Sequence, residues 1–298
     1  MNAASSPVGA RGWWLFAAMA LLWGVPYLFI KEAVDSYSPA AVVAGRTLIG
    51  ALVLLPVAIH RGVLRPALKA WPWVLAFGAI EMAGPFVLLS HAEQTLPSGL
   101  TGLLVSTVPL FAAIIAFAGG ERAALGRARV IGLAVGFAGV AVIVAGPGLA
   151  VGEGAVVAVG EVLLTAVCYA IAPFIVATKL REVPALGSIT LSLAAVGLAY
   201  LPIALLSPHG VPTVRSTVSL VLLGVLCTAV AFVAFFALIA EVGPARAPLF
   251  TYVNPIVAIL LGVAILGEDL SVGLLLGFPL VLFGCWLAAT GGVRRAPV

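Results

Sequence analysis

The chain has 298 residues, of which 63% are hydrophobic and 9% are charged, against roughly 45–50% and about 25% in soluble domains. This composition excludes a soluble globular protein and predicts a membrane protein whose main partner is the lipid bilayer. The formal net charge of +4 is small, so we expect no nucleic-acid partner.

Long apolar runs follow one another along the whole chain, and each reaches the roughly 20 residues that a helix needs to cross a bilayer. The runs are continuous rather than alternating, which favours helices over a β-barrel. The predicted fold class is therefore an all-α membrane protein with ten transmembrane helices. In chain order, these span residues 13–34, 39–59, 72–91, 98–118, 130–146, 155–177, 187–206, 217–239, 246–266 and 271–290.

The basic residues predict the orientation, because Lys and Arg are retained on the cytoplasmic side of a membrane. With the N-terminus inside, twelve of the 15 Lys and Arg residues fall in cytoplasmic segments. Lys31 and Arg215 lie outside, and Arg46 lies inside a helix. We therefore expect both termini to be cytoplasmic. No small-residue cleavage site follows the first span, so we expect that span to be retained.

Landmarks in the first half of the chain recur 145 to 147 residues later. The matched pairs are Pro26 and Pro173, Pro39 and Pro184, Pro56 and Pro202, Pro109 and Pro255, Glu121 and Glu268, and Gly139 and Gly284. This offset predicts a duplicated unit, with one copy in residues 13–146 and the other in 154–291. Five helices per copy is an odd number, so the two five-helix repeats must be inverted relative to each other.

Several short motifs resemble one family. They are Trp23-Gly24, Pro39 followed by Arg46, Thr107-Val108-Pro109-Leu110-Phe111, and Asn254-Pro255-Ile256. Together with the ten spans, they resemble the EamA-type family of the drug/metabolite transporter superfamily over essentially the whole chain. The resemblance implies a secondary transporter of the bacterial inner (plasma) membrane, often an exporter of amino acids or other small metabolites. The second copy departs from the first at the Arg46 equivalent, where Leu191-Ser192-Leu193 stands.

Five prolines lie well inside predicted helices: Pro26, Pro85, Pro109, Pro173 and Pro255. Each removes a helical hydrogen bond and is expected to kink its helix. Ser106 and Thr107 precede Pro109, and Thr251, Tyr252 and Asn254 precede Pro255, its equivalent in the second copy, so these polar groups could face one cavity from both repeats. Kinking for packing alone is the alternative.

Charged residues at membrane depth cost roughly 3 kcal/mol or more unless they are paired, hydrated or protonated. Glu81 lies near the middle of the third span, and Glu161 holds a comparable place in the sixth. Either could bind a substrate ammonium or carry a coupling proton. The structural alternative for Glu81 is an ion pair with Arg46, or a protonated carboxyl that is hydrogen-bonded to a neighbouring backbone carbonyl. Arg46 itself could extend to the outer surface, and we expect a structural role for it.

Aromatic side chains could complete a substrate pocket, and the candidates are Trp23, Tyr169 and Tyr252. His91 and Glu93 end the third span, where we expect a solvated loop end; an external pH-sensitive contact is the alternative. Glu121 and Glu268 are expected to cap or tether the hairpins to the fifth and tenth helices. Glycines of these two helices could form a dimer face or pack within the chain, which predicts a monomer or weak homodimer.

We expect a secondary transporter that moves a small-molecule substrate, a neutral or aromatic amino acid or a similar metabolite, by alternating access. The single intramembrane arginine argues against phosphorylated sugars and nucleotide sugars. A channel or a sensory membrane protein is the alternative. We expect no enzymatic activity, because the two aspartates, Asp35 and Asp269, lie at external helix ends and no HExxH occurs. No cofactor and no metal site are expected.

Overall fold

The computed structural model describes residues 9–120, 126–145, 153–208, 210–242 and 247–290, and the regular structure in these ranges is helical. The first half contains α1 (Ala10–Leu22), α2 (Pro26–Val34), α3 (Pro39–His60), α4 (Leu64–Lys69), α5 (Trp71–Gly78), the π-helix η1 (Ala79–Ala83), α6 (Gly84–Ala92), α7 (Ser98–Val105), α8 (Val108–Ala118) and α9 (Arg127–Ala145). The second half contains α10 (Glu153–Lys179), α11 (Ala185–Leu206), α12 (Val214–Gly224), the π-helix η3 (Val225–Val230), α13 (Ala231–Val242), the 3-10 helix η4 (Ala247–Tyr252), α14 (Asn254–Leu266) and α15 (Val272–Thr290).

Within the described residues, nine helical segments are long and apolar enough to cross a membrane. The predicted span 98–118 coincides with Ser98–Ala118, and the predicted span 39–59 with Pro39–His60. The predicted ninth span, 246–266, corresponds to a shorter apolar helix, Phe250–Leu266. The multi-pass, all-helical class is thus confirmed, while the tenth crossing stays a prediction.

Some sequence predictions fall outside the described residues. These are the ones that concern Glu121, Arg122, Arg246 and the chain ends, and most of the join between the predicted repeats at residues 146–154.

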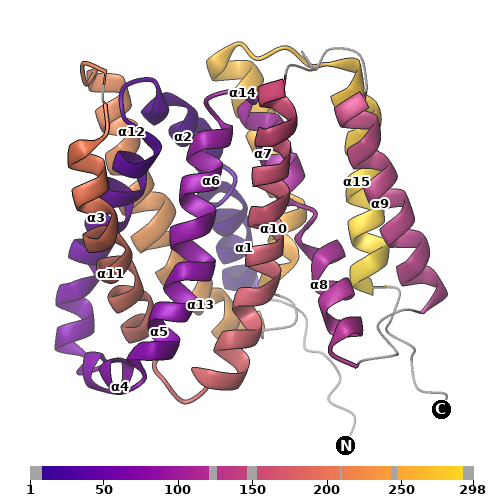
Figure 1. Ribbon diagram of the computed structural model, residues 1–298. Coiled ribbons are helices and arrows are strands. Elements are labelled where there is room, and N and C mark those ends of the chain that lie inside the picture. The colour runs from indigo at the N-terminus through magenta and orange to yellow at the C-terminus, as the bar shows by residue number, and fades with distance from the viewer. Residues whose placement is uncertain (1–8, 121–125, 146–152, 209, 243–246, 291–298) are drawn as a thin grey trace, which may run out of the picture.

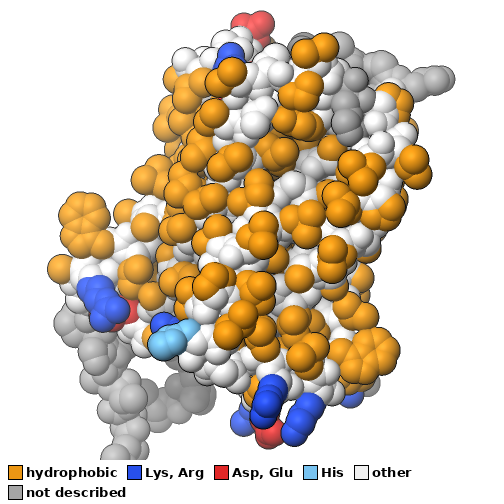
Figure 2. All heavy atoms as spheres, turned by 90° about the vertical axis from the view of Figure 1, so that its left-hand side faces the viewer, with side chains coloured by type: hydrophobic (Ala, Val, Ile, Leu, Met, Phe, Trp, Pro, Cys, Tyr) orange, Lys and Arg blue, Asp and Glu red, His pale blue; other side chains and the backbone are white. Residues whose placement is uncertain are grey.

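The surface of the bundle suits a lipid environment. Leu52 on α3 is 67% exposed and Leu198 on α11 is 63% exposed. Figure 2 shows this side of the molecule, with hydrophobic side chains covering its middle and charged side chains gathered toward its two ends. In water such a face would be an aggregation hazard, whereas in a bilayer it is the expected outer surface.

Helices from the two halves of the chain pack in pairs. α9 lies along α15 at one end of the bundle, and α3 lies along α11 toward the other (Figure 1). Glycines bring α9 and α15 into backbone contact: a Cβ added at Gly284 would lie 2.3 Å from Gly136 N, and one at Gly139 would lie 2.8 Å from Val281 N. The glycine faces therefore pack inside the chain.

Most of the predicted proline positions coincide with helix interruptions. The first span breaks between α1 and α2 before Pro26, and the fourth breaks between α7 and α8 before Pro109. Pro85 follows the π-helix η1, and Pro255 follows η4 at the start of α14. α10, by contrast, continues without interruption through Pro173.

Two irregularities recur at the offset seen in the sequence. The π-helix η1 begins at Ala79 and η3 begins at Val225, 146 residues later. Likewise, α8 begins at Val108 after its break and α14 begins at Asn254. A π-turn leaves backbone groups to be satisfied from outside the helix, and Tyr200 of α11 donates its hydroxyl to Ala83 O at 3.1 Å.

Candidate functional site: a cavity between the two halves

A cavity of about 420 Å³ lies where the interrupted helices meet, and a volume of this size suits a small metabolite. Its walls come from both halves of the chain, with Trp23, Pro26 and Tyr27 from the first half and Tyr169, Pro173 and Asn254 from the second. The walls are mostly apolar, and Arg46 and Glu81 are their charged members among the described residues.

The break between α1 and α2 in the first span is stabilised by hydrogen bonds from Asn254 of the second half. Gly24 N bonds Leu21 O instead of Ala20 O, which leaves the Ala20 carbonyl without its usual helical donor. With its amide nitrogen turned toward them, Asn254 donates to Ala20 O and Phe250 O, each at 3.2 Å. Asn254 therefore both lines the cavity and fixes the two irregular segments beside it.

Arg46 is buried, at 6% exposure, and lines the cavity. Its Nε donates to Thr228 Oγ1 at 3.0 Å, and its Cζ lies 3.7 Å from the centre of the Phe86 ring. The expectation that Arg46 extends to the outer surface is thus not met, because α3 turns this side chain inward. One face of the guanidinium is covered and Nε is engaged, so the two terminal nitrogens remain for a ligand.

Glu81 lies in the π-helix η1 and also lines the cavity. Within the described residues it makes no ion pair or hydrogen bond, so the alternative of an Arg46–Glu81 ion pair is not formed here. A π-turn shifts the residues around it relative to a regular helix, which is a frequent feature of functional sites. The cavity is thus lined by one carboxyl, that of Glu81, and one guanidinium, that of Arg46, which do not pair with each other.

Aromatic rings form much of the remaining wall. The Trp23 ring centre lies 5.0 Å from that of Phe235, 5.4 Å from Phe250 and 5.7 Å from Phe232. Tyr27, Phe86 and Tyr169 also line the cavity. Such rings offer flat apolar faces to a ligand and allow tilted or edge contacts with an aromatic one.

The structure separates the other predicted site residues from this cavity. Thr107 is fully buried, donates to Leu104 O at 2.6 Å and is not among the lining residues. The Tyr252 hydroxyl donates to Cys285 O at 3.3 Å. Their neighbours Ser106 and Thr251 line the cavity in their place. Pro85 and Pro255 are also absent from the lining.

Glu161 lies elsewhere, at the surface of α10. Its Oε1 is 2.8 Å from Nδ1 of His91, so it ties α10 to α6. Glu93 was expected at a solvated loop end, and this expectation is wrong for it, because Glu93 is 0% exposed. His91 is exposed, as expected.

Sequence reasoning missed the contribution of the eighth span. Cys227 in η3 and Phe232 and Phe235 in α13 line the cavity, yet no proline or charge marks this span. The repeat offset could have identified it, because η3 stands 146 residues after η1, which carries Glu81.

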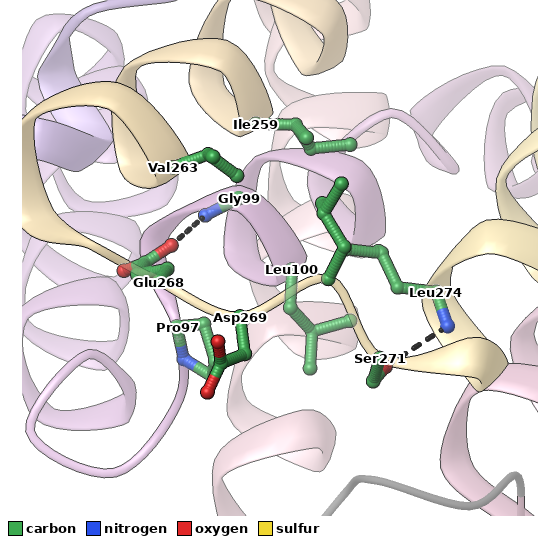
Figure 3. Close-up of a pocket in the computed structure, with 10 residues that line it drawn as sticks. Pro97, Gly99, Leu100, Ile259, Val263, Glu268, Asp269, Ser271 and Leu274 are labelled. Carbon is green, nitrogen blue, oxygen red and sulfur yellow. Dashed lines mark hydrogen bonds between the residues drawn. The ribbon is translucent and has the colours of Figure 1, made fainter.

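A second, much smaller hollow of about 40 Å³ lies beside the loop after α14 (Figure 3). Here Glu268 accepts hydrogen bonds from Ser98 N at 2.7 Å and from Gly99 N at 3.2 Å. A carboxylate at a helix N-terminus satisfies free amides and matches the helix dipole. Glu268 therefore has a capping role, as one of the two expected alternatives stated, but the helix that it caps is α7.

Comparison with known proteins gives a consistent result. The model of the EamA-like transporter family matches residues 10–145 and again residues 157–290. An Escherichia coli K12 protein named "Uncharacterized inner membrane transporter YedA" is 26% identical over 279 residues, which cover 92% of this chain and 89% of the relative. A Bacillus subtilis protein named "Uncharacterized transporter YvbV" is 29% identical, over 93% of this chain and 90% of its own.

One relative carries a more specific name. A "Probable terminal-alkyne amino-acid exporter" of Streptantibioticus cattleyicolor is 28% identical over 258 residues, which cover 86% of this chain and 85% of the exporter. A crystal structure matches with a TM-score of 0.66 at 24% identity, covering 97% of this chain and 100% of the other. At that identity the structural match supports the fold alone.

Proposed function

Because this chain belongs to the EamA-like transporter family, we propose that it is a secondary transporter that exports neutral or aromatic amino acids, or similar small metabolites, by alternating access. The chain is a multi-pass protein of the inner membrane, and its relatives are named as transporters. The cargo and the transport cycle are the proposal.

One observation carries the choice of cargo: the cavity holds one guanidinium and one carboxyl that do not pair with each other, within aromatic walls. The terminal nitrogens of Arg46 would bind a carboxylate through two parallel hydrogen bonds. Glu81 would accept hydrogen bonds from an ammonium. An α-amino acid supplies both groups on one carbon, and its side chain would lie against the rings of Trp23 and Tyr169.

Charge bookkeeping favours a zwitterion over a polyanion. Each charge at membrane depth costs roughly 3 kcal/mol or more when it is unpaired, and a bound amino acid would compensate both of these at once. A phosphorylated sugar would meet one guanidinium and would also face the carboxyl of Glu81. The same argument disfavours nucleotide sugars.

Alternating access requires two halves that can exchange conformations. The matched breaks at Val108 and Asn254 and the matched π-helices η1 and η3 support a duplicated chain, with repeats at 13–146 and 154–291. The helix pairs support it too, because α6 packs on α10 while α13 packs on α1, which are corresponding pairs if the repeats exchange roles. We further propose ten crossings with both termini cytoplasmic, acting as a monomer or weak homodimer.

The test is transport by the purified protein in liposomes. Liposomes preloaded with an unlabelled neutral amino acid should accumulate the labelled one by exchange, with saturation and stereoselectivity. Glu81→Gln and Arg46→Gln should lower this exchange at least tenfold, since each removes a charged contact worth roughly 1.5–3 kcal/mol. Glu182→Gln removes an exposed carboxyl outside the cavity and should leave exchange unchanged.

Two outcomes would contradict the proposal. An ion conductance far faster than any exchange would indicate a channel. Saturable uptake of sugar phosphates without uptake of amino acids would indicate the wrong cargo class.

A further inference from the structure

Glu93 is a buried carboxyl that lies outside the cavity lining. It follows α6 directly and is 0% exposed, and both of its carboxyl oxygens are buried without a hydrogen-bond partner in the described part of the chain. An ionised carboxylate in such a place would lack both water and donors, which costs several kcal/mol. The neutral acid avoids most of that cost.

The nearest cation does not bind this carboxyl. Lys31 of α2 directs its ammonium to two backbone carbonyls instead, Glu93 O at 2.5 Å and Leu96 O at 3.0 Å. Lys31 therefore contacts residue 93 and leaves its carboxyl alone.

Other charged and titratable groups face Glu93 from the surrounding elements. Lys31 and Tyr27 come from α2, Arg46 from α3, and Glu268 from the segment after α14. Burial raises the pKa of Glu93, which lies just outside the span Trp71–Ala92, well above its ordinary value. Lys31 and Arg46 lower this pKa and Glu268 raises it, and burial outweighs them all.

We propose that Glu93 is a proton-binding site, protonated in the conformation described here and deprotonated when α2 moves. On deprotonation the proton passes from the carboxyl to water, and the carboxylate left behind binds the Lys31 ammonium. Protonation of Glu93 thus selects which group of residue 93 the lysine holds.

The site is connected to the cavity through α2. Tyr27 lines the cavity and lies one turn before Lys31 on the same helix. A movement of α2 at Lys31 would therefore also move Tyr27 in the cavity wall. Proton binding at Glu93 would then bias the position of α2 relative to α6 and α7. This step rests on the proposed transport function, whereas the protonation state of Glu93 does not.

An infrared measurement tests the site without any transport. Protein purified in detergent near neutral pH should show the carbonyl stretch of a protonated carboxylic acid, and part of that band should disappear in Glu93→Gln. The glutamine has the shape of the neutral acid, so we expect this variant to fold. Glu93→Asp should shift the same part of the band and serves if the glutamine variant does not fold. Recording both in a Glu81→Gln background removes any signal from the carboxyl that lines the cavity.

An unchanged carbonyl band in both Glu93 variants would overturn the proposal. The transport consequence is tested separately: Glu93→Gln should retain exchange but lose its stimulation by a pH gradient. Wild-type stimulation in Glu93→Gln would overturn the coupling role. If the wild-type protein shows no amino-acid exchange, the proposed transport function is contradicted, whereas the infrared result on Glu93 is unaffected.

Discussion

Glu32 and Arg215 form an ion pair that joins α2 to α12, with 2.6 Å between Glu32 Oε1 and Arg215 Nη2. Glu32 is buried and also accepts a hydrogen bond from Ser219. Each ion pair found in the described part of the chain links its first half to its second; the others are His91–Glu161 and Arg11–Glu241. In the alternating access that we propose, the two halves move relative to each other across these contacts.

The Glu32–Arg215 pair should therefore restrain the opening of α2 from α12. In Glu32→Gln the ion pair is lost, so we expect backbone amides near the start of α12 to exchange hydrogen faster. The expected increase is only roughly fivefold, corresponding to about 1 kcal/mol, because the Arg215 side chain is largely exposed and solvent screens the pair. Hydrogen-exchange mass spectrometry measures this. Glu241→Gln is the control, since its pair is longer, at 3.9 Å, and an equal effect there would remove the special role of Glu32.

The contact between α9 and α15 should not tolerate a methyl group. Gly284→Ala would place Cβ 2.3 Å from Gly136 N, and a backbone atom cannot move aside as a side chain can. We expect a loss of about 1–3 kcal/mol in the free energy of unfolding, measured by denaturation in detergent. Gly160→Ala in α10 has nothing within 4 Å of the new Cβ and should be neutral or slightly stabilising. Equal stability of the two variants would show that this close contact does not form.

Trp23 should set the preference for aromatic cargo. Trp23→Leu removes a ring in contact with Phe232, Phe235 and Phe250, so we expect the KM for L-phenylalanine to rise about tenfold and that for L-alanine to change less. Competition between the two amino acids in exchange assays measures the difference. Trp14→Leu, at an exposed position, should leave both values unchanged. An equal rise in KM for both substrates in Trp23→Leu would show that Trp23 does not set the preference for aromatic cargo.

The proposed orientation can be tested by labelling. After replacement of Cys168, Cys227 and Cys285, single cysteines at the exposed positions Arg61 and Gln94 should report opposite sides of the membrane. A membrane-impermeant maleimide added to intact cells should label the Gln94→Cys variant and spare the Arg61→Cys variant. Labelling of Arg61→Cys alone would reverse the orientation.

Hydropathy and the positions of proline predicted the helical segments closely. A helix needs a long apolar run to cross the bilayer, and proline interrupts a helix because it lacks a backbone N–H. The same signals also pointed to Arg46, Glu81 and Asn254, whose chemistry is costly in lipid. They did not determine which side of an interrupted helix faces inward. One residue turns an α-helix by about 100°, so of the polar residues before the two prolines Ser106 and Thr251 line the cavity, whereas Thr107 and Tyr252 do not.

Burial produced by distant contacts was beyond local sequence patterns. Glu93 follows the last apolar residue of its span, as a solvated loop residue would, yet it is enclosed by contacts that involve Lys31 and Leu96. Phe232 and Phe235 likewise look like ordinary lipid-facing residues until α13 is placed beside Trp23. Such positions depend on the packing of helices far apart in the chain.

The central claim is that Arg46 and Glu81 together recognise the two charges of an amino acid. Exchange of labelled L-phenylalanine in liposomes, competed by 3-phenylpropionate and by phenethylamine, tests it directly, because each competitor keeps one of the two charges. We predict that unlabelled L-phenylalanine competes at least tenfold better than either, that Glu81→Gln removes its advantage over 3-phenylpropionate, and that Arg46→Gln removes its advantage over phenethylamine. Equal competition by all three compounds in the wild-type protein would contradict the claim.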